Sequence, residues 1–282
     1  MPEERLSKDQ RREAAREAAR VAREKRERAA KLRRWLIPTV VTVVIVALAA
    51  TITVVAITSA PPPQAEAGPR NMVSDGILFQ GEDGEMVPVE TPAIPASGTP
   101  TPTEPEDDGL VHIVSYVDLS CPACQAFEEA YADPIQQLVA AGQATLEIHP
   151  IAILDNAYTT NYSTRSNNAI ACVANYAPES FYDTMEALYE NQAEERTAGL
   201  RNSQIKDIIH GAGLENADVD RCIDGTVFEP WLTSATLRAA SDSSLYQPGK
   251  ASIATPTVTV NGDLWSNSGD FMEFVQQHLT VD

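Results

Sequence analysis

Residues 111–127, VHIVSYVDLSCPACQAF, place two cysteines at the junction of two predicted elements. The first seven residues are mostly β-branched or apolar, as in a central strand. Pro122 then suits the first turn of a helix, where its missing N–H group costs nothing. The sequence therefore predicts a strand that leads directly into a helix, with Cys121 and Cys124 at the start of that helix.

The segments around this stretch predict an α/β fold for residues 110–282. Apolar residues at helical spacing continue the first helix to Gly142, and amphipathic runs without a strand pattern fill residues 156–246. The remaining predicted elements are strands at 144–154, 257–260 and 263–265 and a closing helix at 269–279. The predicted order is thus strand, helix, strand, a long helical insertion, two strands and a helix.

A Cys-X-X-Cys pair at the start of a helix favours thiol chemistry. The helix N-terminus stabilises the thiolate of the first cysteine, which gives it a pKa of roughly 3.5 to 7.5 in place of about 8.5. A thiolate of low pKa is also a good leaving group, and this makes the paired disulfide an oxidant. We therefore expect Cys121 to be the nucleophile and Cys124 to resolve the mixed disulfide.

The other cysteines and the histidines indicate different roles. Cys172 and Cys222 lie 50 residues apart in the predicted insertion, where a structural disulfide would stabilise the fold by about 3 to 4 kcal/mol. The four histidines lack metal-ligand spacing, so we expect no metal centre, and no motif implies a cofactor. A thiol-based metal-binding module built from Cys121, Cys124 and one histidine, such as His149, remains an alternative.

Residues 36–58 are predicted to form a transmembrane helix. They are 23 residues without a charge, long enough at about 1.5 Å per residue to cross a hydrocarbon core of about 30 Å. Residues 1–35 hold 13 Lys and Arg, so we expect a basic cytoplasmic helix or tail there. This predicts a single-pass protein of the cell membrane with an extracytoplasmic domain. A cleaved signal peptide competes, although the basic leader and the apolar run are long for one.

The chain beyond residue 35 is acidic. The whole sequence has 21 Lys and Arg and 40 Asp and Glu, of which residues 36–282 hold 8 and 33. Their net charge of -25 (8 - 33) argues against a nucleic-acid partner, because such proteins need a basic face. Residues 59–109 are rich in Pro and are predicted to be a linker that contains a short hairpin between residues 76 and 90.

The Cys-Pro-Ala-Cys motif resembles that of the DsbA-like thioredoxin-fold family, in particular its membrane-anchored actinobacterial members. The resemblance covers about residues 70–282 and rests on that motif with Phe127 and Glu128 behind it, the helical insertion, and Ala254-Thr255-Pro256-Thr257 ahead of a strand and an Asn-Gly turn. It implies a thioredoxin-like fold in which Pro256 is cis and packs beside the active-site disulfide, while the Thr255 backbone contacts substrate. Similar actinobacterial proteins also carry a second disulfide in the insertion, which matches Cys172 and Cys222.

Two positions depart from the family pattern. The dipeptide between the cysteines is Pro122-Ala123, where family oxidases often have His as its second residue. Ser115 stands six residues before Cys121, where many relatives have a buried acid. The first change predicts a weaker oxidant, and the second removes a proton relay. Asp118 either replaces that acid in part or is a loop acid that caps the helix.

The resemblance implies a membrane-anchored extracytoplasmic thiol-disulfide oxidoreductase that forms disulfides in secreted proteins through Cys121 and Cys124. Its expected partners are unfolded or reduced secreted proteins and a membrane redox partner that reoxidises the active site. A disulfide reductase or isomerase would use the same cysteines at a lower potential. A redox-inactive interaction domain is disfavoured because both motif cysteines are present.

Overall fold

The computed structural model describes residues 67–103 and 109–279. The predicted cytoplasmic segment 1–35 and the predicted transmembrane segment 36–58 lie outside these residues. In the described part of the chain, no helix has the length and apolar character needed to cross a bilayer.

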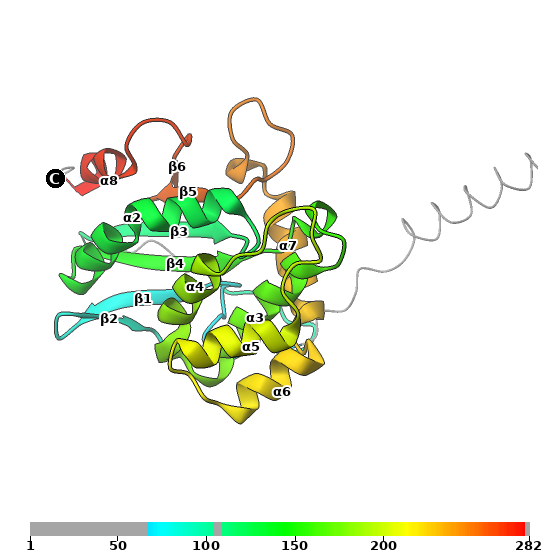
Figure 1. Ribbon diagram of the computed structural model, residues 1–282. Coiled ribbons are helices and arrows are strands. Elements are labelled where there is room, and N and C mark those ends of the chain that lie inside the picture. The colour runs from blue at the N-terminus through cyan, green and yellow to red at the C-terminus, as the bar shows by residue number, and fades with distance from the viewer. Residues whose placement is uncertain (1–66, 104–108, 280–282) are drawn as a thin grey trace, which may run out of the picture. The chain divides into compact units, whose positions relative to one another are not determined.

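A six-stranded sheet in the order β2-β1-β4-β3-β5-β6 forms the centre of the domain (Figure 1). Its strands are β1 (Ile77–Glu82), β2 (Glu85–Pro88), β3 (Val111–Val117), β4 (Ala144–Pro150), β5 (Thr257–Val260) and β6 (Asp263–Leu264). β3 and β4 are parallel, whereas the pairs β1–β2, β1–β4, β3–β5 and β5–β6 are antiparallel. A parallel pair needs a crossover connection, and α2 (Pro122–Ala140) supplies it. The predicted strand, helix and strand are confirmed, although β4 ends four residues before the predicted limit at 154.

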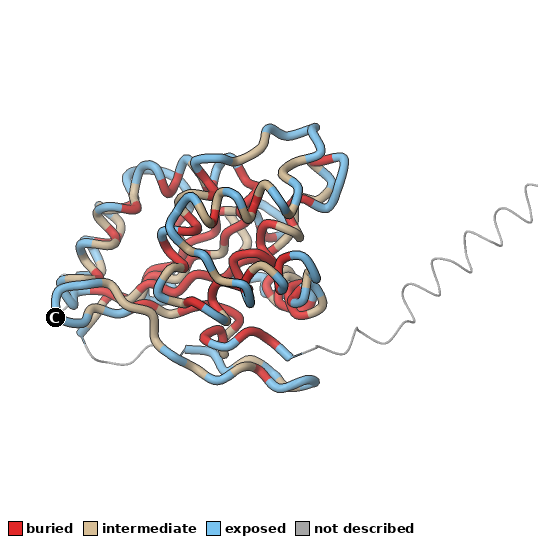
Figure 2. Tube along the Cα trace, turned by 60° about the horizontal axis from the view of Figure 1, so that its bottom comes forward, coloured by how far each residue is buried: buried red, intermediate tan, exposed pale blue. Residues whose placement is uncertain are grey.

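The two faces of the sheet are covered by different elements. Val111, Ile113 and Val117 of β3 belong to the main hydrophobic core, which also includes buried residues of α2 and of α8 (Phe271–Leu279). Val114 and Tyr116 alternate with them and line a cavity beside α7 (Glu229–Ser241). Figure 2 shows the buried residues concentrated in the interior, where the central strands and the faces of the covering helices meet.

The predicted helical insertion is confirmed between β4 and β5. Its helices are α3 (Tyr162–Tyr176), α4 (Phe181–Glu190), α5 (Asn202–Gly211), α6 (Ala217–Gly225) and α7, with short 3-10 turns at Asp155–Ala157, Pro178–Ser180 and Ser243–Leu245. α3 is buried along most of its length, because α4, α5, α6 and α7 all pack against it. A disulfide joins Cys172 of α3 to Cys222 of α6, with the two Cα atoms 5.8 Å apart.

The predicted boundary at residue 110 is wrong, because much of the predicted linker 59–109 belongs to the folded domain. β1 and β2 form the expected hairpin, but β1 also pairs with β4, with Ile77 opposite Ile148. Ahead of the hairpin, the side-chain amide of Asn71 donates a hydrogen bond of 2.8 Å to the carbonyl of Ala174 in α3. The local Pro-rich composition predicts a linker, whereas these long-range contacts make residues 67–103 part of the sheet and its cover.

Candidate active site

The cysteine motif lies where β3 ends and α2 begins. Cys121 is the N-cap residue of α2, with an extended backbone (φ -89°, ψ 117°), and Pro122 occupies the first turn. The Cys121 N–H donates to the carbonyl of Asp118 at 2.9 Å, which closes the turn between strand and helix. The backbone N–H groups of Ala123 and Cys124 face the first sulfur and favour its thiolate, and the Cys124 N–H also donates to the Cys121 carbonyl at 3.1 Å. Cys121 and Cys124 are not bonded to each other in this structure.

The environment separates the two thiols in acidity. A hydrogen bond from the Cys124 thiol is the main cause that lowers the pKa of Cys121 to about 6; burial opposes it, and Thr255 and the N–H groups of the first turn also lower it. Burial is the main cause that raises the pKa of Cys124 well above its ordinary value, and the neighbouring Cys121 sulfur adds to it. At neutral pH, Cys121 is therefore the thiolate and Cys124 the thiol.

Pro256 lies directly before β5, in the turn that contacts Cys121. The Thr255–Pro256 peptide bond is cis, and the Sγ of Cys121 lies 3.2 Å from the Thr255 carbonyl oxygen, 134 residues away in sequence. The side-chain amide of Asn267 donates to the Pro256 carbonyl at 3.3 Å, and the Thr257 hydroxyl donates to the Ala254 carbonyl at 2.7 Å. These contacts hold the turn against the first sulfur, because β5 pairs with β3 immediately after it.

Asp118 orders the loop that precedes the motif. It is fully buried, and its two carboxylate oxygens accept six hydrogen bonds from the loop, from the segment after β4 and from α3. The donors are the N–H and hydroxyl of Ser120, the N–H groups of Ile153 and Leu154, the Ser163 hydroxyl and the Asn167 amide. A buried carboxylate needs this many donors to offset its lost hydration. The geometry supports the interpretation of Asp118 as a loop acid.

Two residues of the insertion also hold this loop, and no sequence pattern predicts them. The Tyr158 hydroxyl donates to the Ser120 carbonyl at 2.7 Å, and the Gln192 side-chain amide donates to the Leu119 carbonyl at 2.9 Å. Both residues lie outside regular helices and outside any motif. The insertion therefore supports the active-site loop from a distance in sequence that no local pattern reveals.

The buried acid of this site comes from α2 and not from β3. Ser115, on β3, is buried and its hydroxyl has no partner in the described part of the chain. Glu128 is 9% exposed and accepts a hydrogen bond of 3.0 Å from the Tyr182 hydroxyl of α4. Burial is the main cause that raises its pKa to about 7. The sequence signal was its i+4 spacing from Cys124, which places both side chains on one helix face.

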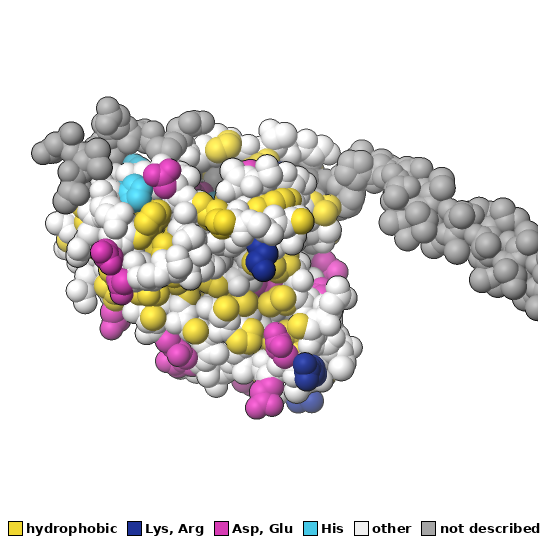
Figure 3. Space-filling model, turned by 90° about the horizontal axis from the view of Figure 1, so that it is seen from above, with side chains coloured by type: hydrophobic (Ala, Val, Ile, Leu, Met, Phe, Trp, Pro, Cys, Tyr) yellow, Lys and Arg dark blue, Asp and Glu magenta, His cyan; other side chains and the backbone are white. Residues whose placement is uncertain are grey.

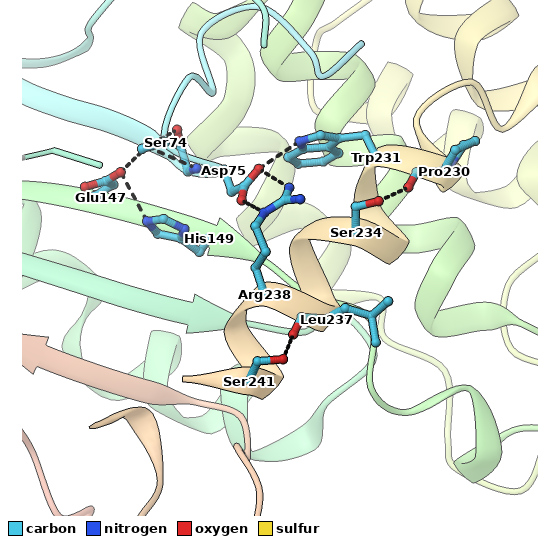
Figure 4. A network of polar contacts seen from close by, with 11 residues as sticks. Ser74, Asp75, Glu147, His149, Pro230, Trp231, Ser234, Leu237, Arg238 and Ser241 are labelled. Carbon is cyan, nitrogen blue, oxygen red and sulfur yellow. Dashed lines mark hydrogen bonds and ion pairs between the residues drawn. The ribbon is translucent and has the colours of Figure 1, made fainter. Parts of the chain in front are cut away.

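A second polar cluster lies around β4 and α7 (Figure 4). Arg238 donates to both carboxylate oxygens of Asp75, at 2.6 and 2.7 Å, and fastens the segment before β1 to α7. His149 pairs with Glu147 at 3.1 Å and stacks on Tyr116, with ring centroids 4.6 Å apart. His149 is thus engaged in this cluster, and no three His, Cys, Asp or Glu side chains of the described residues form a group that could hold a metal ion.

The structure brings six predicted site residues together and places the other two elsewhere. The first group is Cys121, Pro122, Ala123, Cys124, Thr255 and Pro256. The second is Cys172 and Cys222, which are buried at 0% and 2% exposure and bonded to each other within the insertion. Pro122 and Ala123 are exposed, so the side of the motif that carries this dipeptide faces solvent.

Solved structures share this fold at low sequence identity. Reduced DsbA from Mycobacterium tuberculosis aligns with a TM-score of 0.54 and 23% identity over 73% of this chain and 93% of its own. The disulfide bond oxidoreductase DsbG from the same organism gives 0.52 and 23% over 72% and 87%, and oxidised BdbD from Bacillus subtilis gives 0.53 and 16% over 77% and 100%. No curated protein matches the chain in sequence.

These alignments show a DsbA-like thioredoxin fold, in which the helical insertion lies between β4 and β5 along the chain. The sequence model described as thioredoxin matches residues 106–277, which is more than half of the chain. The matched range contains both motif cysteines, the insertion and the cis proline. The chain therefore belongs to the thioredoxin family.

Proposed function

We propose that this protein is a thiol-disulfide oxidoreductase that forms disulfides in secreted proteins, with Cys121 as the nucleophile and Cys124 as the resolving cysteine. The observation that carries the proposal is the geometry at the start of α2, where the Cys121 Sγ lies 3.2 Å from the Thr255 carbonyl oxygen beside the cis proline and Cys124 is buried behind it at 1% exposure. This environment lowers the pKa of Cys121 to about 6 and raises that of Cys124. Such a pair has one sulfur that attacks or leaves readily at neutral pH and one that stays protonated until it is needed.

In the oxidising direction, a substrate thiolate attacks the Sγ of Cys121 in the Cys121–Cys124 disulfide. The S–S bond breaks, and its electron pair goes to Cys124, which takes up a proton. A second substrate thiolate then attacks the substrate sulfur of the mixed disulfide, and Cys121 leaves as a thiolate. The substrate has lost two electrons and gained a disulfide, and the protein is left as a dithiol. Its low pKa favours Cys121 as the leaving group in this second step.

The surface near the motif suits an unfolded polypeptide. The backbone of Thr255, adjacent to the Cys121 sulfur, is placed to pair with an extended substrate segment. The face seen from above, which carries the loop ahead of β5, exposes hydrophobic side chains, with acidic side chains toward its edge (Figure 3). Apolar contact and backbone pairing do not depend on substrate sequence, so reduced secreted proteins of many kinds fit this proposal.

Two observations bear on the direction of exchange. The pKa of Cys121, about 6, lies between about 7 for thioredoxin and about 3.5 for DsbA, so we expect a reduction potential between roughly -270 and -120 mV. Such a protein oxidises most reduced secreted chains. The Ala123 side chain has no group that could hydrogen-bond the thiolate, and this favours the second candidate, a disulfide reductase or isomerase with a potential near the lower limit.

The membrane anchor is the remaining part of the proposal. Residues 36–58 hold the protein in the cell membrane with the N-terminus in the cytoplasm and the catalytic domain outside. The buried Cys172–Cys222 disulfide supports this side of the membrane, because disulfides persist in oxidising compartments. A membrane redox partner would then accept the two electrons from Cys121 and Cys124 and restore their disulfide.

The test is oxidation of reduced, unfolded ribonuclease by the full-length oxidised protein. We expect recovery of ribonuclease activity, loss of that recovery in Cys121→Ala, and a titrated potential in the range above. Wild-type recovery in Cys121→Ala would overturn the nucleophile assignment. A potential at or below that of thioredoxin, about -270 mV, would replace the oxidase by the reductase.

A further inference from the structure

The turn 254–256 lies beyond the ends of both strands that flank β5. On one side, β3 pairs with β5 only as far as Tyr116 opposite Thr257. On the other side, the hairpin with β6 ends where the Trp265 N–H donates to the Val258 carbonyl at 2.9 Å. No described strand therefore pairs with the turn, although it approaches the reactive sulfur to 3.2 Å.

Asn267 takes the place of the missing strand on the β6 side. Two residues further along the hairpin register, it would stand opposite Pro256 and donate through its backbone N–H. Its backbone is left-handed instead (φ 54°), and the chain leaves the sheet there toward α8 (Figure 1). Its side-chain amide supplies the hydrogen bond, to the Pro256 carbonyl at 3.3 Å. Asparagine suits this position because it adopts the left-handed conformation more readily than most residues and carries a donor.

The segment that carries Asn267 is itself anchored close to the motif. The Gln247 side-chain amide donates to the Trp265 carbonyl at 3.0 Å. The Trp265 ring is 7% exposed and packs against Phe127 of α2, with ring centroids 5.8 Å apart. Asn267 therefore reaches the turn from a support that is fixed to the helix that begins at the motif.

The edge of the turn beside the sulfur is free. The Thr255 N–H donates to no described residue, and the Thr255 carbonyl lies beside the Cys121 Sγ. Thr255 is half-buried and Ala254 is exposed. An unpaired strand edge is a template for a second extended chain. The backbone on either side of a substrate cysteine would pair with this Thr255 edge.

We propose that Asn267 is a positioning residue for polypeptide substrates, whose amide fixes the outer side of the turn and so keeps the Thr255 edge in place beside the Cys121 sulfur. A substrate cysteine then meets that sulfur while its flanking backbone pairs with the edge. Asn267 acts through Pro256 and takes no part in the exchange itself. This deepens the proposed function and rests on it.

Loss of the Asn267 amide should loosen this edge more than it disturbs the sulfur. It leaves the Pro256 carbonyl without its donor and frees the turn on its outer side, so a substrate that pairs there must first order the turn. β5 stays paired with β3, and Cys121 stays at the start of α2. A thiol without a peptide backbone, such as 2-mercaptoethanol, needs only the sulfur and should react at a nearly unchanged rate.

The test compares how fast two thiols open the Cys121–Cys124 disulfide of the full-length oxidised protein. One is an unstructured peptide with a single cysteine, and the other is 2-mercaptoethanol. Acid quenching and alkylation of the released thiols give both rates. Asn267→Gly keeps the left-handed backbone and removes the amide. We expect it to lower the peptide rate by about fivefold and the 2-mercaptoethanol rate by less than about twofold.

Asn261→Gly is the matched control. Asn261 also has a left-handed backbone (φ 51°) and a side-chain hydrogen bond, but it lies at the opposite end of β5 from Pro256. This variant should leave both rates within about twofold of the wild type. Asn267→Asp keeps the backbone preference but cannot donate when ionised, so it should follow Asn267→Gly and replaces that variant if it does not fold.

A second peptide tests the pairing itself. When the peptide nitrogens that flank its cysteine are methylated, they cannot enter a strand ladder, so the wild type and Asn267→Gly should react with this peptide at equal rates.

The outcomes separate this inference from the proposed function. A peptide rate in Asn267→Gly equal to that of the wild type overturns the positioning role. An equal loss with 2-mercaptoethanol overturns it too, because the effect would then lie at the sulfur, and an equal loss in Asn261→Gly would assign the effect to the hairpin as a whole. If neither thiol opens the wild-type disulfide, the proposed function itself fails, and this inference fails with it.

Discussion

The molecule contains two cysteine pairs with opposite properties. Cys121 and Cys124 lie at the start of a helix, unbonded and unequal in acidity, whereas Cys172 and Cys222 lie within two helices of the insertion and form a disulfide. All four are buried, with exposures of 6%, 1%, 0% and 2%. Burial alone therefore does not decide reactivity; the hydrogen bonds that the Cys121 sulfur accepts from the Cys124 thiol and from the N–H groups of the first turn of α2 do.

The largest difference between the pairs should be seen on removing the first sulfur. We expect Cys121→Ser to lower the rate of disulfide exchange with a reduced peptide by at least about a thousandfold, because no other thiolate is available. Cys124→Ser should instead accumulate a mixed disulfide at Cys121. Mass spectrometry should find the mixed disulfide in Cys124→Ser and none in Cys121→Ser. An adduct on Cys172 or Cys222 would remove the distinction between the pairs.

The next effect is the pH dependence of Cys121. Alkylation of the reduced protein by iodoacetamide should rise with a midpoint near pH 6, whereas a denatured control rises near about pH 8.5. Because the folded pKa is lowered, the reduced fold gains stability as pH rises from about 6 to about 8.5 and loses it as pH falls through about 6. A midpoint above pH 8 in the folded protein contradicts the assignment.

The structural pair should affect stability and not chemistry. Replacing Cys172 and Cys222 together by Ala should lower the free energy of unfolding by about 3 to 4 kcal/mol, because the denatured chain loses a closed loop of 50 residues. Urea unfolding of the double variant and of the wild type, both with Cys121 and Cys124 reduced and with the Cys172–Cys222 bond of the wild type intact, measures this difference. At 25 °C the folded variant should retain its exchange rate within about twofold, and a hundredfold loss would mean that the insertion takes part in the reaction.

The smallest expected effect tests how the insertion supports the active-site loop. Tyr158→Phe removes the hydroxyl that donates to the carbonyl of Ser120 at 2.7 Å and also contacts the carbonyl of Ala193 at 3.2 Å, and should cost about 0.5 to 1.5 kcal/mol of stability. Thermal unfolding measures the cost, and Tyr176→Phe, at an exposed position, is the matched control. A cost equal to that of the control would show that the loop is held without Tyr158.

Local sequence was informative where one element determines the property. The alternation in Val111 to Val117 predicted β3, and Pro122 after Cys121 predicted a helix that starts at the motif. The helical runs after residue 156 predicted the insertion. Each of these features depends on neighbours within a few residues, so the periodicity of side chains is sufficient to reveal it.

The hairpin and the supporting residues depended on distant contacts. The β1 strand is short and half-polar, and only its pairing with β4 makes it part of the sheet. Tyr158 and Gln192 carry no motif, and their side chains matter because folding brings them to the carbonyls of Ser120 and Leu119. The composition of residues 59–109 predicted a linker, because a stretch rich in prolines and acids has the same local sequence whether it is a free linker or is packed against the domain, as residues 67–103 are.

The sequence by itself determined the family, the order of elements and the two cysteines on which the proposed chemistry depends, because a Cys-X-X-Cys motif at a helix start is recognisable from a few consecutive residues. Only the tertiary structure decided which groups surround those sulfurs. Thr255 is 134 residues from Cys121, and Tyr158, which holds the carbonyl next to Cys121, belongs to the insertion. The acidity of a buried thiol depends on distances in space, and these distances are set by packing.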